Sequence, residues 1–291
     1  MLSALLKGSL KEKYPEFCER PLVIVRGAGD LASGTIEALH RCGFAVLALE
    51  VDRPSAIRRA VAFSEAVYHG ETKLEGIRAR LGKDRESIDS ILASGDVAIA
   101  IDPRGEWIET YKPLILIDAI LAKRNLGTWA SMAPITVALG PGFEAPQDAD
   151  VVIETQRGHR LGRLIREGSA IPNTGVPGLI AGHGRERVIY APVAGRFRAC
   201  HAIGDLVEAE ELVAEILDPE DGRVIGECRS AIAGVLRGIL PDGFPCSAGL
   251  KSADVDPRLE EQENCFTISD KSRALGHACL RAVFEELQRL A

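Results

Sequence analysis

The chain has 291 residues, of which 46% are hydrophobic and 26% charged, and its formal net charge at pH 7 is −7. This length and composition are those of a globular protein large enough for two domains, each with its own core. Because proteins that bind nucleic acids or anionic membranes usually carry a basic excess, the negative charge argues against both kinds of partner.

The N-terminal segment, residues 1–20, has one short apolar patch followed by several lysines, and it lacks the plan of a signal peptide. No apolar run in the chain approaches the roughly 18 residues that a transmembrane helix needs. We therefore expect a cytoplasmic protein without a membrane partner.

The most informative stretch is a buried strand that leads through a glycine turn into a helix. The apolar run at residues 22–25 predicts the strand, and Gly27, Gly29 and Ala32 fit the pattern G-x-G-x-x-A of dinucleotide-binding folds. Gly27 allows a sharp turn, Gly29 admits a pyrophosphate, and Ala32 lets helix and strand pack closely. The helix, at about residues 30–41, would direct its first N–H groups at the phosphates.

A second apolar strand at residues 44–49 ends at Glu50, near the spacing at which such folds place the acid that binds ribose. Asp30 would face an incoming phosphate, and like charges repel unless a cation lies between them. We expect Asp30 to be the N-cap of the first helix, with a ligand role as the alternative.

Arginines follow the second strand closely. Arg58 and Arg59, together with Arg53, could pair with a ribose 2′-phosphate, which favours NADP, whereas Glu50 favours NAD. The alternative is that these arginines are solvated charges on a short helix. The cofactor therefore stays open between NAD, NADP and another phosphorylated nucleotide.

Strand and helix signals alternate as far as residue 125, which predicts a Rossmann-like domain over residues 1–125 with a mostly parallel sheet. One of the helical patterns lies near residues 74–81. Two further buried strands end at Asp102 and Asp118. Because open α/β sheets bind ligands at the carboxyl ends of their strands, both aspartates are candidate site residues, and the alternative is that they cap the following turns.

Residues 126–186 predict a β-rich connecting region of short strands and glycine turns. Within it, Arg157, His159, Arg160 and Arg163 gather beside glycines in a chain whose net charge is negative. Such a local reversal of sign could bind a phosphate or a carboxylate, and the alternative is a solvated turn. We expect Arg157 and His159 at the anionic far end of a bound ligand.

Residues 187–262 contain two segments that look like copies of one unit at an offset of 39 residues, with Gly195 matching Gly234. The unit resembles the half-motif of biotinyl and lipoyl domains, which modify a lysine at the hairpin between their halves. The corresponding link, residues 218–223, contains no lysine. We therefore expect a structural or docking module and not a swinging-arm carrier.

Residues 263–291 predict a C-terminal helix that ends at Leu290, is capped by Ser269 or Asp270, and packs on a domain or on a second subunit of a homo-oligomer. The seven cysteines are scattered and contain no C-x-x-C pair, so we expect neither a disulfide framework nor a metal site. The predicted fold class is α/β. It comprises a Rossmann-like, mostly parallel sheet, a β-rich region with a biotinyl/lipoyl-like duplicated β module, and a C-terminal helix.

Several segments spread over nearly the whole chain carry a resemblance to a known family. They include Arg26–Gly34, Pro54–Arg59, Asp118–Asn125, Leu139–Phe143, Glu154–His159, Asn173–Gly175, Asp254–Arg258 and Ile268–Lys271. With these segments the chain resembles the YqeB family, which is associated with selenium-dependent molybdenum hydroxylases. Its first half also resembles the Rossmann part of XdhC-type accessory proteins, which assist insertion or sulfuration of the molybdenum cofactor in xanthine dehydrogenases.

The resemblance implies an accessory role in the maturation of a molybdenum hydroxylase, which would be the client enzyme. The ligand at the glycine turn would be NAD(P) or molybdopterin dinucleotide, and no catalytic residues follow from the resemblance. The alternatives are a small NAD(P)-dependent oxidoreductase and a docking scaffold without ligand chemistry. Gly29→Asp would abolish the function of an accessory protein or an oxidoreductase and would spare that of a scaffold.

Overall fold

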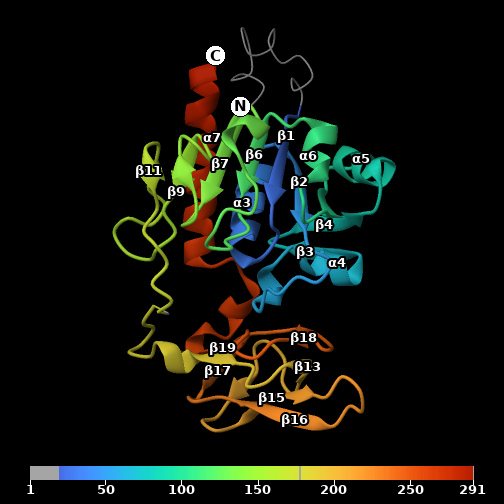
Figure 1. Ribbon diagram of the computed structural model, residues 1–291, viewed down its shortest axis with the longest axis vertical. Coiled ribbons are helices and arrows are strands. Elements are labelled where there is room, and N and C mark those ends of the chain that lie inside the picture. The colour runs from blue at the N-terminus through green and yellow to red at the C-terminus, as the bar shows by residue number, and fades with distance from the viewer. Residues whose placement is uncertain (1–19, 177, 291) are drawn as a thin grey trace. The chain divides into compact units, whose positions relative to one another are not determined.

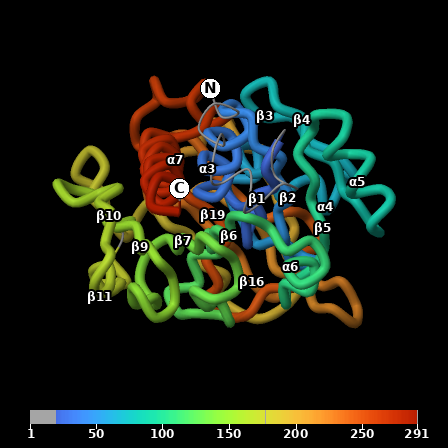
Figure 2. The backbone as a smooth tube through the Cα atoms, turned by 90° about the horizontal axis from the view of Figure 1, so that it is seen from above, coloured from blue at the N-terminus to red at the C-terminus, as the bar shows by residue number. Residues whose placement is uncertain are grey.

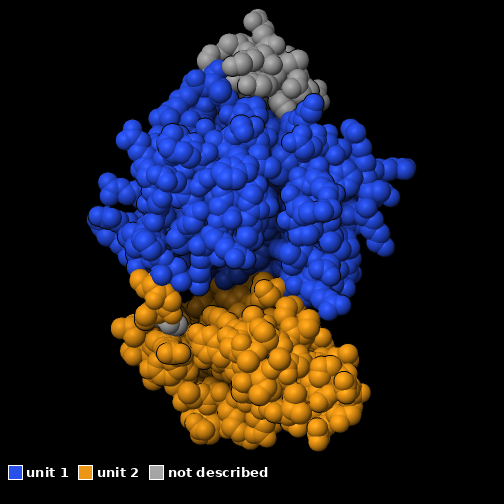
Figure 3. Space-filling view, in the orientation of Figure 1, with its two compact units in different colours: residues 1–54, 62–173, 268–291 blue, residues 55–61, 174–267 orange. Residues whose placement is uncertain are grey.

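The computed structural model describes residues 20–176 and 178–290, and the chain divides into two compact units (Figure 3). The first unit comprises residues 1–54, 62–173 and 268–291, and the second comprises residues 55–61 and 174–267. The N-terminal segment for which the sequence predicts no signal peptide lies almost entirely outside the described residues. Within the described part of the chain, no helix combines the length and the apolar character needed to cross a membrane.

The first unit is built on a nine-stranded sheet in the order β10-β9-β7-β6-β1-β2-β5-β4-β3 (Figure 1). Its strands are β1 (Leu22–Arg26), β2 (Ala45–Glu50), β3 (Glu71–Leu74), β4 (Ile77–Gly82), β5 (Val97–Ile101), β6 (Ile115–Asp118), β7 (Ile135–Leu139), β9 (Val151–Ile153) and β10 (Leu164–Ile165). The seven inner strands are parallel, and the edge strands β3 and β10 are antiparallel to their neighbours. The mostly parallel α/β sheet predicted from the sequence is confirmed. The order β5-β2-β1-β6-β7-β9 corresponds to the strand order of dinucleotide-binding folds.

Helices cover both faces of this sheet, which is why its central strands β1, β2, β5, β6 and β7 are mostly apolar, whereas β4, next to the edge, carries Arg78 and Arg80. The helices are α3 (Asp30–Arg41), α4 (Glu65–His69), α5 (Arg85–Ala93), α6 (Glu106–Tyr111) and α7 (Asp270–Leu290), with a 3-10 turn η3 (Ala130–Met132). On one face, Ile88 of α5 and Ile108 of α6 pack on Ile24, Leu47 and Leu116, which lie side by side in the sheet. The other face is covered by α3 and α7, which lie beside each other (Figure 2).

The contact between α3 and α7 is unusually close. Gly34 of α3 and Gly276 of α7 face each other, and a Cβ on Gly276 would lie 2.2 Å from the carbonyl oxygen of Gly34. Ser272 Oγ donates to the carbonyl of Asp30 (2.9 Å) and accepts from the backbone N–H of Gly34 (3.1 Å). The C-terminal helix therefore packs within its own chain, on the helix that follows the glycine turn.

Residues 74–81, for which the sequence predicts a helical pattern, form the hairpin of β3 and β4 instead. The cause is the turn between them: Glu75 and Gly76 both have positive φ, 50° and 80°. Two successive residues with positive φ are the signature of a type I′ turn, whose twist matches that of the paired strands. The prediction of a helix here was wrong because the turn, and not the apolar period, decides the local structure.

The boundary predicted at residue 125 is not a boundary between the units. β7 and β9 continue the sheet of the first unit, since Ile135 pairs with Ile115 and every residue of β7 is buried. The short strands β8 (Glu144–Ala145) and β11 (Gly168–Ser169) pair in the same unit. The boundaries predicted at 186 and 262 also shift, to 173 and 267, and the C-terminal helix joins the first unit because it packs on α3.

The second unit consists of two four-stranded antiparallel sheets, in the orders β12-β19-β17-β14 and β16-β15-β13-β18. Its strands are β12 (Val188–Tyr190), β13 (Gly195–Ala199), β14 (Leu206–Val207), β15 (Leu212–Leu217), β16 (Val224–Arg229), β17 (Gly234–Ile239), β18 (Pro245–Cys246) and β19 (Lys251–Asp256). The 3-10 turns η2 (Arg59–Val61), η4 (Arg185–Arg187), η5 (Leu259–Glu261) and η6 (Glu263–Phe266) complete it. Phe197, Ile216, Leu236 and Val255 are fully or almost fully buried in one core that both sheets share.

The strand positions repeat at the offset of 39 residues found in the sequence. β13, β14 and β15 are followed 39 residues later by β17, β18 and β19. The pairings repeat as well, because β13 pairs with β15 and β18, whereas β17 pairs with β19 and β14. The two matching glycines also make the same contact: a Cβ on Gly195 would lie 2.6 Å from the carbonyl of Leu217, and one on Gly234 would lie 2.3 Å from that of Asp256. The internal duplication is therefore present in the structure.

We expect Gly195→Ala to destabilise the second unit by about 1–3 kcal/mol, because an added methyl group overpacks the contact with β15. The nearest atoms would be the carbonyl oxygen of Leu217 and Cγ2 of Ile216, both at 2.6 Å. Hydrogen exchange of the amides in residues 188–256 measures the loss. Ser247→Ala, at an exposed position of the same unit, is the control and should leave exchange unchanged. Equal protection in both variants would contradict the close contact.

Candidate functional site

The glycine turn predicted from the sequence lies at the carboxyl end of β1, between β2 and β6. Strand order reverses at this point of the sheet, and open α/β sheets bind ligands there. Gly27 has φ of 96°, and a Cβ on it would lie 2.9 Å from the carbonyl oxygen of Ala119. A side chain is excluded here by both backbone conformation and space, as the sequence predicts for the first glycine of the turn.

Glu50, the predicted ribose-binding acid, lies directly beside the turn. Its Oε2 accepts from the backbone N–H of Ala28 (2.8 Å), and its Oε1 accepts from that of Val51 (2.9 Å). The carbonyl of Ala28 accepts in turn from the N–H of Ser64 (2.9 Å). The Glu50 carboxylate thus holds the turn in shape, and each of its oxygens keeps a second lone pair for a ligand hydroxyl.

The pKa of Glu50 is raised, chiefly by burial, while the two backbone hydrogen bonds act in the opposite direction. The folded state therefore binds this proton more tightly than the unfolded chain does, and the contribution of Glu50 to the free energy of unfolding should fall as pH rises above about 4.5. Urea unfolding of wild type and Glu50→Gln at several pH values isolates this contribution. The difference between wild type and variant should decrease with rising pH in that window, and an increase would contradict the assignment.

The helix α3 begins at Asp30, and its N-cap is Gly29, which has extended backbone with φ of −69°. The expectation that Asp30 is the N-cap is therefore corrected by one residue, because the chain enters the helix directly from the glycine turn. Because the N-cap residue is a glycine, it supplies no side-chain cap to this end of α3. Ala32 is 1% exposed, which agrees with the close helix packing predicted for this position.

Lys271, which the sequence analysis did not single out as a site residue, is brought to this end of α3 by the packing of α7. Its pKa is lowered by burial first and by Arg157 second, whereas Asp30, Asp270 and Glu154 raise it. Two contacts of the neighbouring residues place Lys271 there, because Ser272 donates to the carbonyl of Asp30 and Asp270 pairs with Arg157. Lys271 ends one of the segments that carry the family resemblance, but its place beside the turn follows from the packing of α7 on α3 and not from the local sequence.

Arg157 donates to both carboxylate oxygens of Asp270, at 2.7 and 2.9 Å, in a partly exposed ion pair. The structure therefore brings Arg157 to the start of α7, next to Lys271. His159 lies two residues further along the same loop and is exposed. Of these two predicted site residues, Arg157 alone is placed in the charged cluster by a contact.

Asp102 and Asp118 are buried at the carboxyl ends of β5 and β6. Asp102 accepts from the backbone N–H groups of Gly105 and Trp107, both at 2.8 Å, as a capping group does. Asp118 accepts from the N–H of Ile120 and from the hydroxyl of Thr128 (2.6 Å), and burial raises its pKa. Both carboxylates organise the loops that follow their strands.

Arg58 and Arg59 belong to the second unit, so the structure does not join them to the glycine turn within one unit. Arg58 is 8% exposed and donates to the carbonyl of Asn264 (3.4 Å). Arg59 donates to the carbonyl of Ile239 (3.0 Å). The alternative of solvated arginines on a short helix is wrong for Arg58, which is buried where the segment around η2 packs on β17 and η6 of the second unit. Among residues 20–176 and 178–290, no three His, Cys, Asp or Glu side chains are grouped to hold a metal ion.

The fold and the residues at the carboxyl end of the sheet define an α/β protein. Its mostly parallel sheet carries a glycine turn where the strand order reverses. No family model matches the chain. The chain is a homologue of the uncharacterized protein YqeB of Escherichia coli (strain K12), with 46% identity over 277 residues that make up 95% of this chain and 50% of YqeB. The chain therefore spans about half the length of this curated relative.

Solved structures offer only distant similarity. The ectoine utilization protein EutE (DoeB) from Ruegeria pomeroyi, in its product-bound form, is 14% identical with a TM-score of 0.27, over 81% of this chain and 85% of its own. An aspartoacylase family protein from Mesorhizobium loti is 14% identical, and a succinylglutamate desuccinylase/aspartoacylase from Rhodobacter sphaeroides is 16% identical. Both have a TM-score of 0.28 and cover 82% of this chain and 86% of their own. Neither activity nor substrate follows from similarity at this level.

Proposed function

We propose that the first unit binds a phosphate-bearing dinucleotide at the glycine turn and that the protein acts in the maturation of a molybdenum hydroxylase. The ligand is NAD(P) or molybdopterin dinucleotide. The observation that supports this most directly is the juxtaposition of the turn, the start of α3 and Lys271 at the switch point of the sheet. The first N–H groups of a helix attract anions, and a neighbouring ammonium group adds to that attraction.

Each part of the ligand has a counterpart at this edge. Gly27 makes the sharp turn, and Gly29 leaves the backbone open to the pyrophosphate, which would lie at the start of α3 beside Lys271. A ribose hydroxyl would donate to the remaining lone pairs of Glu50. Arg157, already anchored to Asp270, would meet charge at the far end of the ligand. The client enzyme and the molybdenum connection rest on the family resemblance of the sequence.

The duplicated unit supports a second role in the same function. We infer that it is a docking module of the biotinyl/lipoyl type that binds the client hydroxylase. The hairpin between β15 and β16, residues 218–223, contains no lysine that could carry a biotinyl or lipoyl group. Without the carrier lysine, this module cannot carry a biotinyl or lipoyl group. Its folded surface could still recognise the client hydroxylase.

Mass spectrometry of small molecules released from freshly purified, denatured protein tests the proposal. A thermal-shift titration with NAD, NADP, CDP and molybdopterin dinucleotide follows. Release of molybdopterin dinucleotide, or stabilisation by its nucleotide half, supports a cofactor chaperone. NAD(P) alone would support ligand binding at the glycine turn but favour an oxidoreductase over the maturation role. The absence of any nucleotide effect would contradict ligand binding and favour a docking scaffold.

Lys271→Gln should weaken binding of the stabilising nucleotide by about 1.5–3 kcal/mol, the worth of a hydrogen bond to a charged group. The substitution removes the positive charge next to the phosphates and shortens the side chain by one atom, and the control variant below carries the same two changes. Titration calorimetry measures the change. Lys83→Gln, at an exposed position before α5, is the matched control and should bind as wild type does. Equal affinities of both variants would remove Lys271 from the site.

A further inference from the structure

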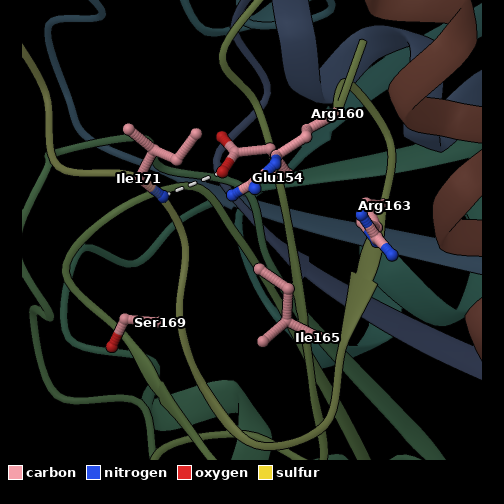
Figure 4. A pocket seen from close by; sticks show the side chains of 6 residues that line it. All are labelled: Glu154, Arg160, Arg163, Ile165, Ser169 and Ile171. Carbon is pink, nitrogen blue, oxygen red and sulfur yellow. Dashed lines mark hydrogen bonds between the residues drawn. The ribbon is translucent and has the colours of Figure 1, made fainter.

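Beyond the glycine turn, the first unit has a pocket of about 250 Å³ on the segment that follows β9 (Figure 4). It is lined by Glu154, Arg160, Arg163, Ile165, Ser169 and Ile171. All six come from a single stretch of chain that leaves β9, passes through β10 and β11, and returns to Glu154. The pocket is therefore a property of the first unit alone.

Glu154 closes this stretch into a ring. Its side chain accepts from the backbone N–H of Gln156 (2.7 Å) and from that of Ile171 (2.8 Å), and its own N–H donates to the carbonyl of Arg163 (3.0 Å). It is only 2% exposed. Gly162 packs close to Ala278 of α7. The hydrogen bonds of Glu154 and the packing of Gly162 thus hold the backbone around the pocket in place. A ligand would therefore meet a preformed pocket.

The four arginines of this segment fall into two kinds. Arg157 is paired with Asp270, and Arg166 is paired with Glu285 and Glu286, so the outer two are held by carboxylates of α7. Arg160 and Arg163, which line the pocket, form no ion pair or side-chain hydrogen bond with any residue of 20–176 or 178–290. Their charges are left for a ligand, in a chain whose net charge is negative.

We propose that this pocket binds a singly charged oxyanion, a carboxylate or a phosphodiester, that is attached to an apolar group. Two guanidinium groups and the Glu154 carboxylate leave one net positive charge, which matches one negative charge better than two. Guanidinium groups bind oxyanions through paired N–H donors, and the Ser169 hydroxyl adds another donor. Ile165 and Ile171 provide the apolar wall. The proposal does not depend on a nucleotide binding at the glycine turn.

Site-resolved modification of arginines by phenylglyoxal, read by peptide mass spectrometry, tests this site with butyrate and dimethyl phosphate as probes. At ten times the dissociation constant, occupancy should slow modification of Arg160 and Arg163 by about tenfold. Arg104, an exposed arginine beside α6, serves as the control and should react at an unchanged rate. Protection by butyrate alone identifies a carboxylate site, and protection by dimethyl phosphate alone identifies a phosphodiester site.

Three results would overturn the proposal. The first is equal protection by inorganic phosphate or chloride, which would indicate unspecific screening. The second is equal protection by formate and butyrate, which would exclude the apolar wall. The third is butyrate binding that is retained in the double variant Arg160→Gln/Arg163→Gln. Both side chains are exposed, so the two substitutions should leave the fold intact. Nucleotide binding retained in that double variant separates this pocket from the glycine turn, so either site can fail without the other.

Discussion

Gly276→Ala is expected to destabilise the first unit by about 3 kcal/mol or more, although alanine ordinarily stabilises a helix by about 1 kcal/mol relative to glycine. At the crossing of α7 with α3, a new Cβ would lie 2.2 Å from the carbonyl oxygen of Gly34 and 2.7 Å from its carbon. Because both are backbone atoms, no side-chain rotation relieves the clash, and the helices must separate. Trp107 and Trp129, the two tryptophans of the chain, belong to the first unit, so their fluorescence during urea unfolding reports its stability.

Gly34→Ala tests the same crossing from the other helix, since a Cβ there would lie 2.3 Å from the carbonyl oxygen of Ser272. Ser90→Ala, at an exposed position of α5, is the control, and its effect should stay within about 0.5 kcal/mol. A Gly276→Ala protein as stable as wild type would show that the crossing tolerates a methyl group. The gain in helix propensity from glycine to alanine would then offset any cost of the added methyl group in the free energy of unfolding.

Asp118→Ala is expected to cost about 3–5 kcal/mol of the unfolding free energy, because it leaves a buried guanidinium without its carboxylate. Arg26 and Asp118 are 2% and 1% exposed, and their closest charged atoms lie 3.6 Å apart. The hydroxyl of Thr128 lies between them, accepting from Arg26 and donating to Asp118. Arg26 also donates to the carbonyl of Leu126, so the network ties the loop after β6 to the end of β1. Tryptophan fluorescence in urea measures the loss.

Asp52→Ala is the matched control, since Asp52 is 77% exposed and pairs with Arg53 only at 4.0 Å. Its cost should stay below about 1 kcal/mol. An Asp118→Ala protein with the stability of wild type that had lost nucleotide binding would contradict the anchoring role. It would make Asp118 a ligand residue, the other interpretation that the sequence allows.

Acidic residues at the carboxyl edge share one structural task. Glu50, Asp102, Asp118 and Glu154 each follow or end a parallel strand, and each accepts backbone N–H groups from nearby turns or loops. Such carboxylates satisfy backbone donors that leave the sheet. Carboxylates therefore fix the loops at this edge of the sheet. The cationic side chains Lys271 and Arg157 come from α7 and from the loop after β9. This separation leaves positive charge available to an anionic ligand.

The sequence by itself determined the local features whose cause lies within a few residues. The apolar run of β1 followed by Gly27 predicted the strand and its turn, because a positive φ and a close backbone approach demand glycine. The 39-residue offset predicted the repeated strands of the second unit, because equivalent glycines meet equivalent carbonyls in both copies. The hairpin at Glu75 and Gly76 was missed, since its positive φ at a glutamate has no clear signal in the sequence.

Only the tertiary structure decided which charges share a site. Arg58 follows β2 closely in the sequence, yet its side chain is buried in the second unit through contacts with residues about 200 positions away. Lys271 lies at the far end of the chain, yet the packing of Gly276 on Gly34 brings it beside the glycine turn. Spacing along the chain fixes neighbours on one helix or strand. Contacts between distant segments depend on how their surfaces fit, and no local pattern in this sequence records that fit.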